Sequence, residues 1–290
     1  MLKMSCLMKS MKSTLLALSA FLLINCPVFA DQAPGDTVYI TQAGSNGTIT
    51  TEKTETTGNP DTITVKQEGS SSYETAEVKL AGNGNHSATV NQNGDHDKAE
   101  MSQLGVGDTA EINQSGGSGN STKLIQGDLS VGDTAAVNQV GVVNTGDITQ
   151  NGVSDIAAIS QTGSGNAADI TQGDLSVGET AAITQVGSGT KGEIFQYGLG
   201  DNAAISQTAE GNHATITQEL AGENNKATIN QNTGGHGNTA SIDQYGKNHT
   251  ALIDQRGSSN SANVEQSGML QQARIMQSGN SNIAMITQHQ

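Results

Sequence analysis

The sequence predicts an all-β protein: a parallel two-sheet β-solenoid of the cross-β amyloid type, in which each strand–turn–strand–turn coil takes about 22–24 residues. Three observations predict this fold. A five-residue phrase that ends in glutamine recurs along the chain, and its apolar residues alternate with polar ones. In addition, the segment 168–187 nearly repeats the segment 122–141, and the 46-residue offset corresponds to two coils.

The recurring phrase reads small–x–aliphatic–x–Gln, and each copy predicts one strand. It accounts for 20 of the 24 glutamines, and a further copy has Leu80 in the glutamine position. The central position is isoleucine in 14 of these 21 copies, and it alternates with polar residues. A period of two with β-branched residues is typical of a strand with one buried face. The isoleucines expected in the core are Ile148, Ile159, Ile170, Ile183, Ile194, Ile205, Ile216, Ile229, Ile242 and Ile253.

Between strands the chain reads Gln-x-Gly-x-x-Asn, which predicts a tight corner. Glycine adopts the left-handed backbone that such a corner needs, and Asn or Asp supports it with local hydrogen bonds. Spacings of 13 residues follow Gln126, Gln172 and Gln218, so these longer corners should lie on the same side. With a degenerate strand at 47–52, the phrases give roughly eleven coils, a stack about 50 Å long.

The glutamine of each phrase shares a strand face with the aliphatic residue, so it is expected to point inward. Coils about 4.8 Å apart place each glutamine above an equivalent one, where their amides can form a continuous ladder. The ladder matters because an unpaired buried amide costs about 1–3 kcal/mol. The expected members are Gln92, Gln103, Gln114, Gln126, Gln139, Gln150, Gln161, Gln172, Gln185, Gln196, Gln207, Gln218, Gln231, Gln244, Gln255, Gln266, Gln277 and Gln288.

The first thirty residues are predicted to be a signal peptide. Lys3, Lys9 and Lys12 precede an apolar run at 15–24, and small residues lead to Ala30, after which we expect cleavage. No later stretch is long and apolar enough to suggest a membrane span. The mature protein is therefore expected to be exported and unanchored.

The remaining chain divides into a short segment with degenerate repeats, 31–60, and the repeat solenoid, 61–290. Both cysteines lie in the leader, so the mature chain has no disulfide. Ten basic residues remain against 28 acidic ones, a net charge of −18. This charge argues against nucleic acid as a partner, because nucleic-acid binding needs a basic face. It argues equally against simple attraction to anionic membrane surfaces.

The repeats run close to both ends of the sequence. The last phrase ends at Gln288, the first begins seven residues after Ala30, and no helix or proline-rich cap is visible at either end. An uncapped coil presents unpaired backbone groups to which another molecule can add a strand. Because every coil resembles the next, we expect the chain to polymerise with copies of itself.

The repeat Gln-x-Gly-x-x-Asn-x-Ala-x-(Ile/Val)-x-Gln resembles the curlin repeat of bacterial curli fibres. It is nearly intact at 196–207, 255–266 and 277–288, and the resemblance extends over about 61–290. The resemblance implies a structural subunit of an extracellular amyloid fibre that supports adhesion and biofilm matrix. It also implies export through the periplasm and an outer-membrane channel, and nucleation by a minor subunit. The chain departs from the family in having about twice as many coils and no long Gly/Asn-rich leader.

A calcium site is a weaker interpretation of the repeated GDLSVG corners. Calcium needs six to eight oxygen ligands, and the calcium-binding β-roll repeats every nine residues with paired glycines. We expect solvated corners instead, with Leu129 and Leu175 packed on the flank of the solenoid. The carboxylates concerned are Asp128, Asp133, Asp174 and Glu179.

The histidines do not suggest a metal or cofactor either. The run Asp-His-Asp at 95–97 has no second ligand cluster in phase, and His86 and His249 occupy the asparagine position of their corners. Polysaccharide-cleaving solenoids need paired carboxylates at a special site. Acids such as Asp169 and Asp243 instead fall on ordinary outward positions, as does Asp254, so we expect no enzyme activity.

Two other functions remain as alternatives. An ice-binding solenoid would present ranks of Thr-x-Thr, but among the regular strands only Thr215 and Thr217 form such an outward pair. A monomeric β-solenoid adhesin fits the sequence better. It predicts a protein that stays in solution as single molecules.

Overall fold

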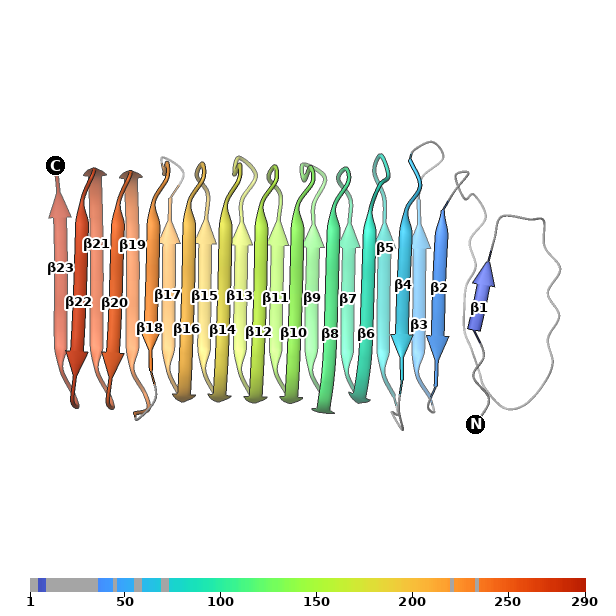
Figure 1. Cartoon of the computed structure of the whole chain (residues 1–290), viewed down its shortest axis with the longest axis horizontal. Helices are drawn as coiled ribbons and strands as arrows, with labels where there is room; N and C mark the ends of the chain where they lie inside the picture. The colour runs from blue at the N-terminus through green and yellow to red at the C-terminus, as the bar shows by residue number, and fades with distance from the viewer. Residues whose placement is uncertain are drawn as a thin grey trace.

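The computed structural model describes residues 5–8, 36–43, 46–54, 59–68, 73–219, 222–232 and 235–290. Throughout these ranges every regular element is a β-strand, and the strands form the two stacked sheets of a long solenoid (Figure 1). The predicted fold class is therefore confirmed. In the same ranges no helix is long and apolar enough to cross a membrane.

One sheet contains the even-numbered strands of the solenoid, and we call it the even sheet. They are β2 (Thr37–Gln42), β4 (Thr62–Gln67), β6 (Ser87–Asp95), β8 (Thr109–Ser118), β10 (Thr134–Val142), β12 (Ile156–Ser164), β14 (Thr180–Ser188), β16 (Asn202–Glu210), β18 (Lys226–Gln231), β20 (Thr250–Arg256) and β22 (Gln272–Ser278). The short strand β1 (Ser5–Met8) lies beside β2 and pairs with it antiparallel. All other pairs in this sheet are parallel.

The other sheet contains the odd-numbered strands from β3 onward, and we call it the odd sheet. They are β3 (Thr48–Lys53), β5 (Thr75–Leu80), β7 (Lys98–Gln103), β9 (Ser121–Gln126), β11 (Thr145–Gln150), β13 (Ala167–Gln172), β15 (Lys191–Gln196), β17 (His213–Gln218), β19 (Thr239–Lys247), β21 (Ser261–Met269) and β23 (Ile283–His289). One even and one odd strand make a coil, so β2 to β23 form eleven strand pairs. Strand β3 contains most of the degenerate strand predicted at 47–52.

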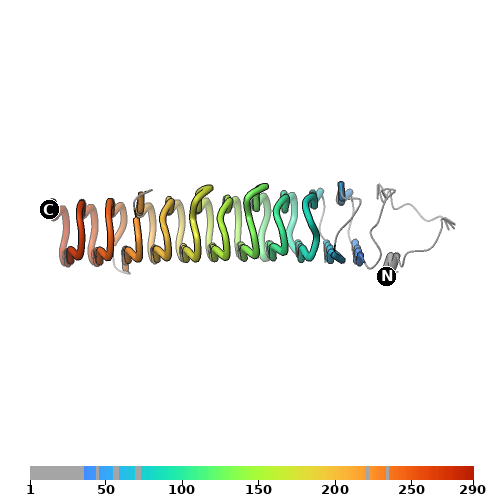
Figure 2. The backbone as a smooth tube through the Cα atoms, turned by 90° about the horizontal axis from the view of Figure 1, so that it is seen from above, coloured from blue at the N-terminus to red at the C-terminus, as the bar shows by residue number. Residues whose placement is uncertain are grey.

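Successive coils stack in register, so equivalent positions of the repeat lie directly above one another. In β12 and β14, for example, Ile159 pairs with Ile183 and Gln161 with Gln185. The three longer corners that follow Gln126, Gln172 and Gln218 come after β9, β13 and β17, which all belong to the odd sheet. They consequently lie along the same edge of the solenoid, at the top of Figure 1. Viewed from above, the backbone forms a narrow, regular stack (Figure 2).

The core lies between the sheets and is thin. Each strand alternates buried and outward residues, as the period of two predicts, and the inward side chains are chiefly Ala, Ile and Gln. The ten isoleucines expected in the core are all at most 2% exposed. Burial of each isoleucine contributes about 1.5–3 kcal/mol, so stacking many coils compensates for the scarcity of aromatic residues.

The predicted processing of the leader falls mostly outside the described residues. The cleavage site after Ala30 lies outside them, as does every residue of the leader except those of β1. The segment 31–60 contributes β2 and β3 to the solenoid, so the repeats begin before residue 61.

Candidate functional site

Two glutamine ladders run through the core, one in each sheet. In each ladder the side-chain Nε2 of a glutamine donates to Oε1 of the glutamine one coil later, over 2.8 to 3.1 Å. The even ladder contains Gln42, Gln67, Gln92, Gln114, Gln139, Gln161, Gln185, Gln207, Gln231, Gln255 and Gln277. The odd ladder contains Gln103, Gln126, Gln150, Gln172, Gln196, Gln218, Gln244, Gln266 and Gln288.

Each interior glutamine also bonds to the backbone of the opposite sheet. Gln161 Nε2 donates to Gln185 Oε1 and to the carbonyl oxygen of Thr145, both at 2.8 Å. Its own Oε1 accepts from Gln139 at 2.9 Å. The amide therefore uses both protons and its acceptor while fully buried, which removes the desolvation cost of an unpaired amide. The ladder joins successive coils and also ties the two sheets together.

A second polar column follows the corners that lead from even to odd strands. Asn144 donates its backbone N–H and its side-chain Nδ2 to Oδ1 of Asn120, at 3.1 and 3.2 Å. Its Nδ2 also donates to the carbonyl oxygen of Gly163 at 3.1 Å. The sequence predicted only local hydrogen bonds for these asparagines, whereas the structure shows bonds between coils. The asparagines of this column are Asn120, Asn144, Asn166, Asn212, Asn238, Asn260 and Asn282.

The corners that lead from odd to even strands place acids at the equivalent position. We call the five consecutive members, at most 1% exposed, the acid column: Asp108, Asp133, Asp155, Glu179 and Asp201. His86 lies one coil before them, and Asn225, His249 and Gln271 continue the position after them. The sequence signal for this column is an acid directly before the strand in successive even phrases. Sequence reasoning missed it because acids are rarely fully buried.

Burial raises the pKa of every carboxyl in the acid column, because the charged form loses its hydration. The pKa of Asp133 rises to about 7, and the neighbouring charges of Asp155 and Asp108 add to the effect of burial. That of Glu179 rises to about 9, chiefly through burial and then through Asp155 and Asp201. That of Asp201 rises to about 6.

The structure corrects two expectations for the GDLSVG corners. Asp133 and Glu179 are not solvated, because they occupy the inward position that asparagine takes in the other corner. Leu129 and Leu175 do not pack on the flank: they are 59% and 69% exposed, because the corner turns the following serine inward instead. Among the described residues, no three His, Cys, Asp or Glu side chains lie close enough together to hold a metal ion.

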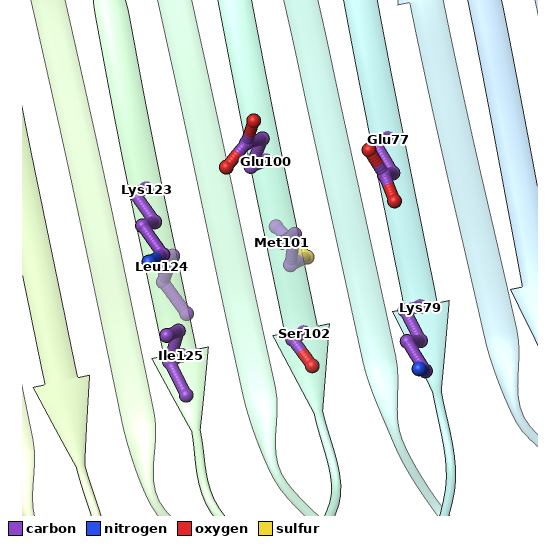
Figure 3. A pocket seen from close by; sticks show the side chains of 8 residues that line it. All are labelled: Glu77, Lys79, Glu100, Met101, Ser102, Lys123, Leu124 and Ile125. Atoms are coloured by element: carbon purple, nitrogen blue, oxygen red, sulfur yellow. The ribbon is translucent and has the colours of Figure 1, made fainter.

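Other charged side chains lie on the outward faces of the strands. Asp169 and Asp243 are partly covered by their neighbours, and burial raises the pKa of both. A shallow hollow of about 170 Å³ lies over β5, β7 and β9 (Figure 3). Glu77 and Glu100 line it together with Lys79 and Lys123, so it gathers charges of both signs.

The repeat that forms these columns also matches a known protein family. The model of the curlin associated repeat matches residues 144–173, 191–219, 235–268 and 257–289. The chain thus contains repeats of the curlin type. These repeats cover strands β11 to β13, β15 to β17 and β19 to β23, where both glutamine ladders continue without interruption. Together with the β-solenoid, they support a curli-type structural protein. No curated protein matches this curlin-repeat chain in a sequence search.

Proposed function

We propose that the protein is a structural subunit of extracellular curli-like amyloid fibres on a bacterial surface, supporting adhesion and biofilm matrix. The observation that carries the proposal is the in-register repetition of the coils. Each coil offers its neighbour the same glutamine amides, backbone groups and apolar side chains. A coil of a second copy offers this set too, so strand addition between chains continues the ladders.

The proposal includes the route by which the chain reaches the surface. The leader is removed after Ala30, and the chain crosses the periplasm and an outer-membrane channel. A minor subunit starts the fibre, and this chain supplies its bulk. The segment 31–60 then forms the first coils, and 61–290 the regular solenoid. The fibre needs no cofactor or metal, and the chain has no catalytic role.

Fibre formation by the purified chain without its leader tests the proposal. We expect filaments in electron micrographs, and a fibre diffraction pattern with a meridional reflection near 4.8 Å and an equatorial one near 10 Å. A chain that stays as single molecules at high concentration for weeks contradicts the proposal and favours the monomeric adhesin.

A matched pair of variants controls this experiment. Ile183→Asp places a charge in the dry core, whereas Val186→Asp places the same charge on an exposed position of the same strand, β14. We expect the first variant to form no filaments and the second to form them as the unmodified chain does. Filaments from both variants would mean that assembly does not use the solenoid core.

A further inference from the structure

The acid column and the asparagine column occupy equivalent corners at opposite edges of the solenoid. In the asparagine column, Asn144 uses one amide both to accept from the next corner and to donate to the previous one. A carboxylate can accept but cannot donate. The five acids are stacked one per coil, about 4.8 Å apart, so their charges repel one another unless some carry a proton.

One oxygen of each acid is satisfied by the corner of a later coil. Asp133 Oδ1 accepts the backbone N–H of Asp155 at 2.9 Å, and Asp155 Oδ1 accepts that of Glu179 at 2.9 Å. Asp201 Oδ1 accepts the N–H of Asn225 at 2.7 Å. Glu179 Oε1 accepts the N–H of Gly198 at 2.5 Å. The backbone therefore supplies at least one donor to each carboxyl group.

The second oxygen divides the column into two kinds of acid. Asp108 accepts the hydroxyl of Ser130 at 2.6 Å, and Asp155 accepts that of Ser176. Both serines belong to the GDLSVG corners. In Asp133, Glu179 and Asp201 the second oxygen is buried and has no hydrogen-bond partner. An oxygen in that situation favours the protonated, uncharged form of its group.

The charged groups that face the column are mostly acids. Asp108, Asp155 and Asp201 face their neighbours within the column, and Glu223 faces Asp201 from the next corner. His86 Nδ1 lies 3.8 Å from Asp108 and accepts the backbone N–H of that residue, at the N-terminal end of the column. Among the described residues, no cationic side chain acts on the pKa of Asp133, Glu179 or Asp201.

We propose that the acid column is a proton-operated switch built into the solenoid: uptake of protons by Asp133, Glu179 and Asp201 tightens the coils from β8 to β16, and their loss loosens them. The inference goes beyond the proposed fibre, because it concerns the stability of the coils themselves and holds for a single chain. Mildly acidic surroundings favour the closed solenoid, and alkaline surroundings favour its opening.

The sign follows from the raised pKa values. In the unfolded chain the two aspartates have their ordinary pKa of 3.8 and the glutamate its ordinary pKa of 4.5. In the solenoid the pKa is about 7 for Asp133, about 9 for Glu179 and about 6 for Asp201. Between the two values the folded chain holds the extra proton, so stability is greatest at low pH and falls as pH rises through the folded pKa. Each such group changes the unfolding equilibrium constant about tenfold per pH unit within its window.

Urea unfolding followed by circular dichroism tests the switch, with EDTA present and protein concentrations kept below those that form fibres. For the unmodified chain without its leader, we expect the unfolding equilibrium constant to rise at least about 100-fold from about pH 5 to about pH 7. A constant that stays the same or falls over this range overturns the proposal.

Two triple variants locate the effect. D133N/E179Q/D201N replaces the three acids by amides, which the same corner position already accommodates at Asn225 and Gln271. D128N/D174N/E210Q removes the same number of charges from exposed positions. We expect the first variant to lose most of the pH dependence and the second to keep it. Equal pH dependence in the two variants overturns the proposal.

Infrared spectroscopy covers the case in which the first variant fails to fold. In the unmodified chain near neutral pH, the switch predicts a carbonyl band of protonated carboxyl groups, which disappears as the pH is raised above about 9. The surface variant should show the same band. Absence of the band at neutral pH means that the column is ionised, and it overturns the proposal.

Discussion

The even and odd ladders differ at their N-terminal ends. The even ladder continues without interruption from Gln42, whereas in the odd ladder Lys53 and Leu80 occupy the first two glutamine positions. Gln103 is the first glutamine of the odd ladder, and its Oε1 is buried without a partner because the side chain of Leu80 has no N–H to donate. The even ladder has no such unsatisfied oxygen among its described members.

In the first coils, an ion cluster joins neighbouring coils where the odd ladder has no glutamine. Lys53 Nζ lies 2.7 Å from Asp36 Oδ2 and 2.9 Å from Asp61 Oδ2, and all three side chains are largely buried. The desolvation of Lys53 is outweighed by these two partners, which together raise its pKa. A coil can therefore be joined to its neighbour by amides or by an ion cluster. Only the amide ladder offers the same groups to every added coil.

The largest expected effect comes from breaking the even ladder at its centre. Gln161→Leu leaves Gln185 Oε1 and the carbonyl oxygen of Thr145 without this donor, and it removes the acceptor of Gln139. At about 1–3 kcal/mol for each unsatisfied group, we expect a loss of about 3–5 kcal/mol in the free energy of unfolding, measured by urea titration. The control is Thr162→Leu, next to Gln161 on the exposed side of β12. A loss below about 1 kcal/mol would show that the ladder does not stabilise the coils.

A smaller loss is expected from the ion cluster. Lys53→Met leaves Asp36 and Asp61 side by side without their cation, and we expect a loss of about 3 kcal/mol in the free energy of unfolding, the lower end of the range for breaking a buried ion pair. The same titration measures it, with the exposed Lys79→Met in β5 as the control. Adding Asp61→Asn to Lys53→Met should restore part of the lost stability. Equal stability of Lys53→Met and Lys79→Met would contradict the role of the cluster.

The smallest expected effect is an increase in the free energy of unfolding. Leu80→Gln supplies the amide N–H that Gln103 Oε1 lacks, so we expect the free energy of unfolding to rise by about 1 kcal/mol. Leu80→Met keeps a similar volume without adding an amide, and it serves as the control. If the glutamine variant were no more stable than the methionine variant, satisfaction of Gln103 would not limit the odd ladder.

The fold was predictable because one short phrase determines where each strand lies, which of its faces is buried and how successive coils align. The glutamine spacing identified the coils, and Leu80 was recognised in a glutamine position. The acid column was not predictable from the same pattern, since Asp133 and Glu179 sit in long corners where a free aspartate or glutamate normally faces water. Which corner residue turns inward depends on the backbone of the corner. For the same reason the sequence suggested that the apolar Leu129 would be covered, whereas the corner buries Ser130.

The mass per unit length of the fibres shows whether whole solenoids join end to end. If the chains join end to end and keep their eleven strand pairs stacked within each molecule, one chain occupies about 50 Å of fibre. Scanning transmission electron microscopy of unstained fibres measures this quantity. We expect about one chain per 50 Å in a single filament. A value near one chain per 4.8 Å would mean that each chain lies flat on an identical copy of itself, and it would contradict the solenoid as the building block of the fibre.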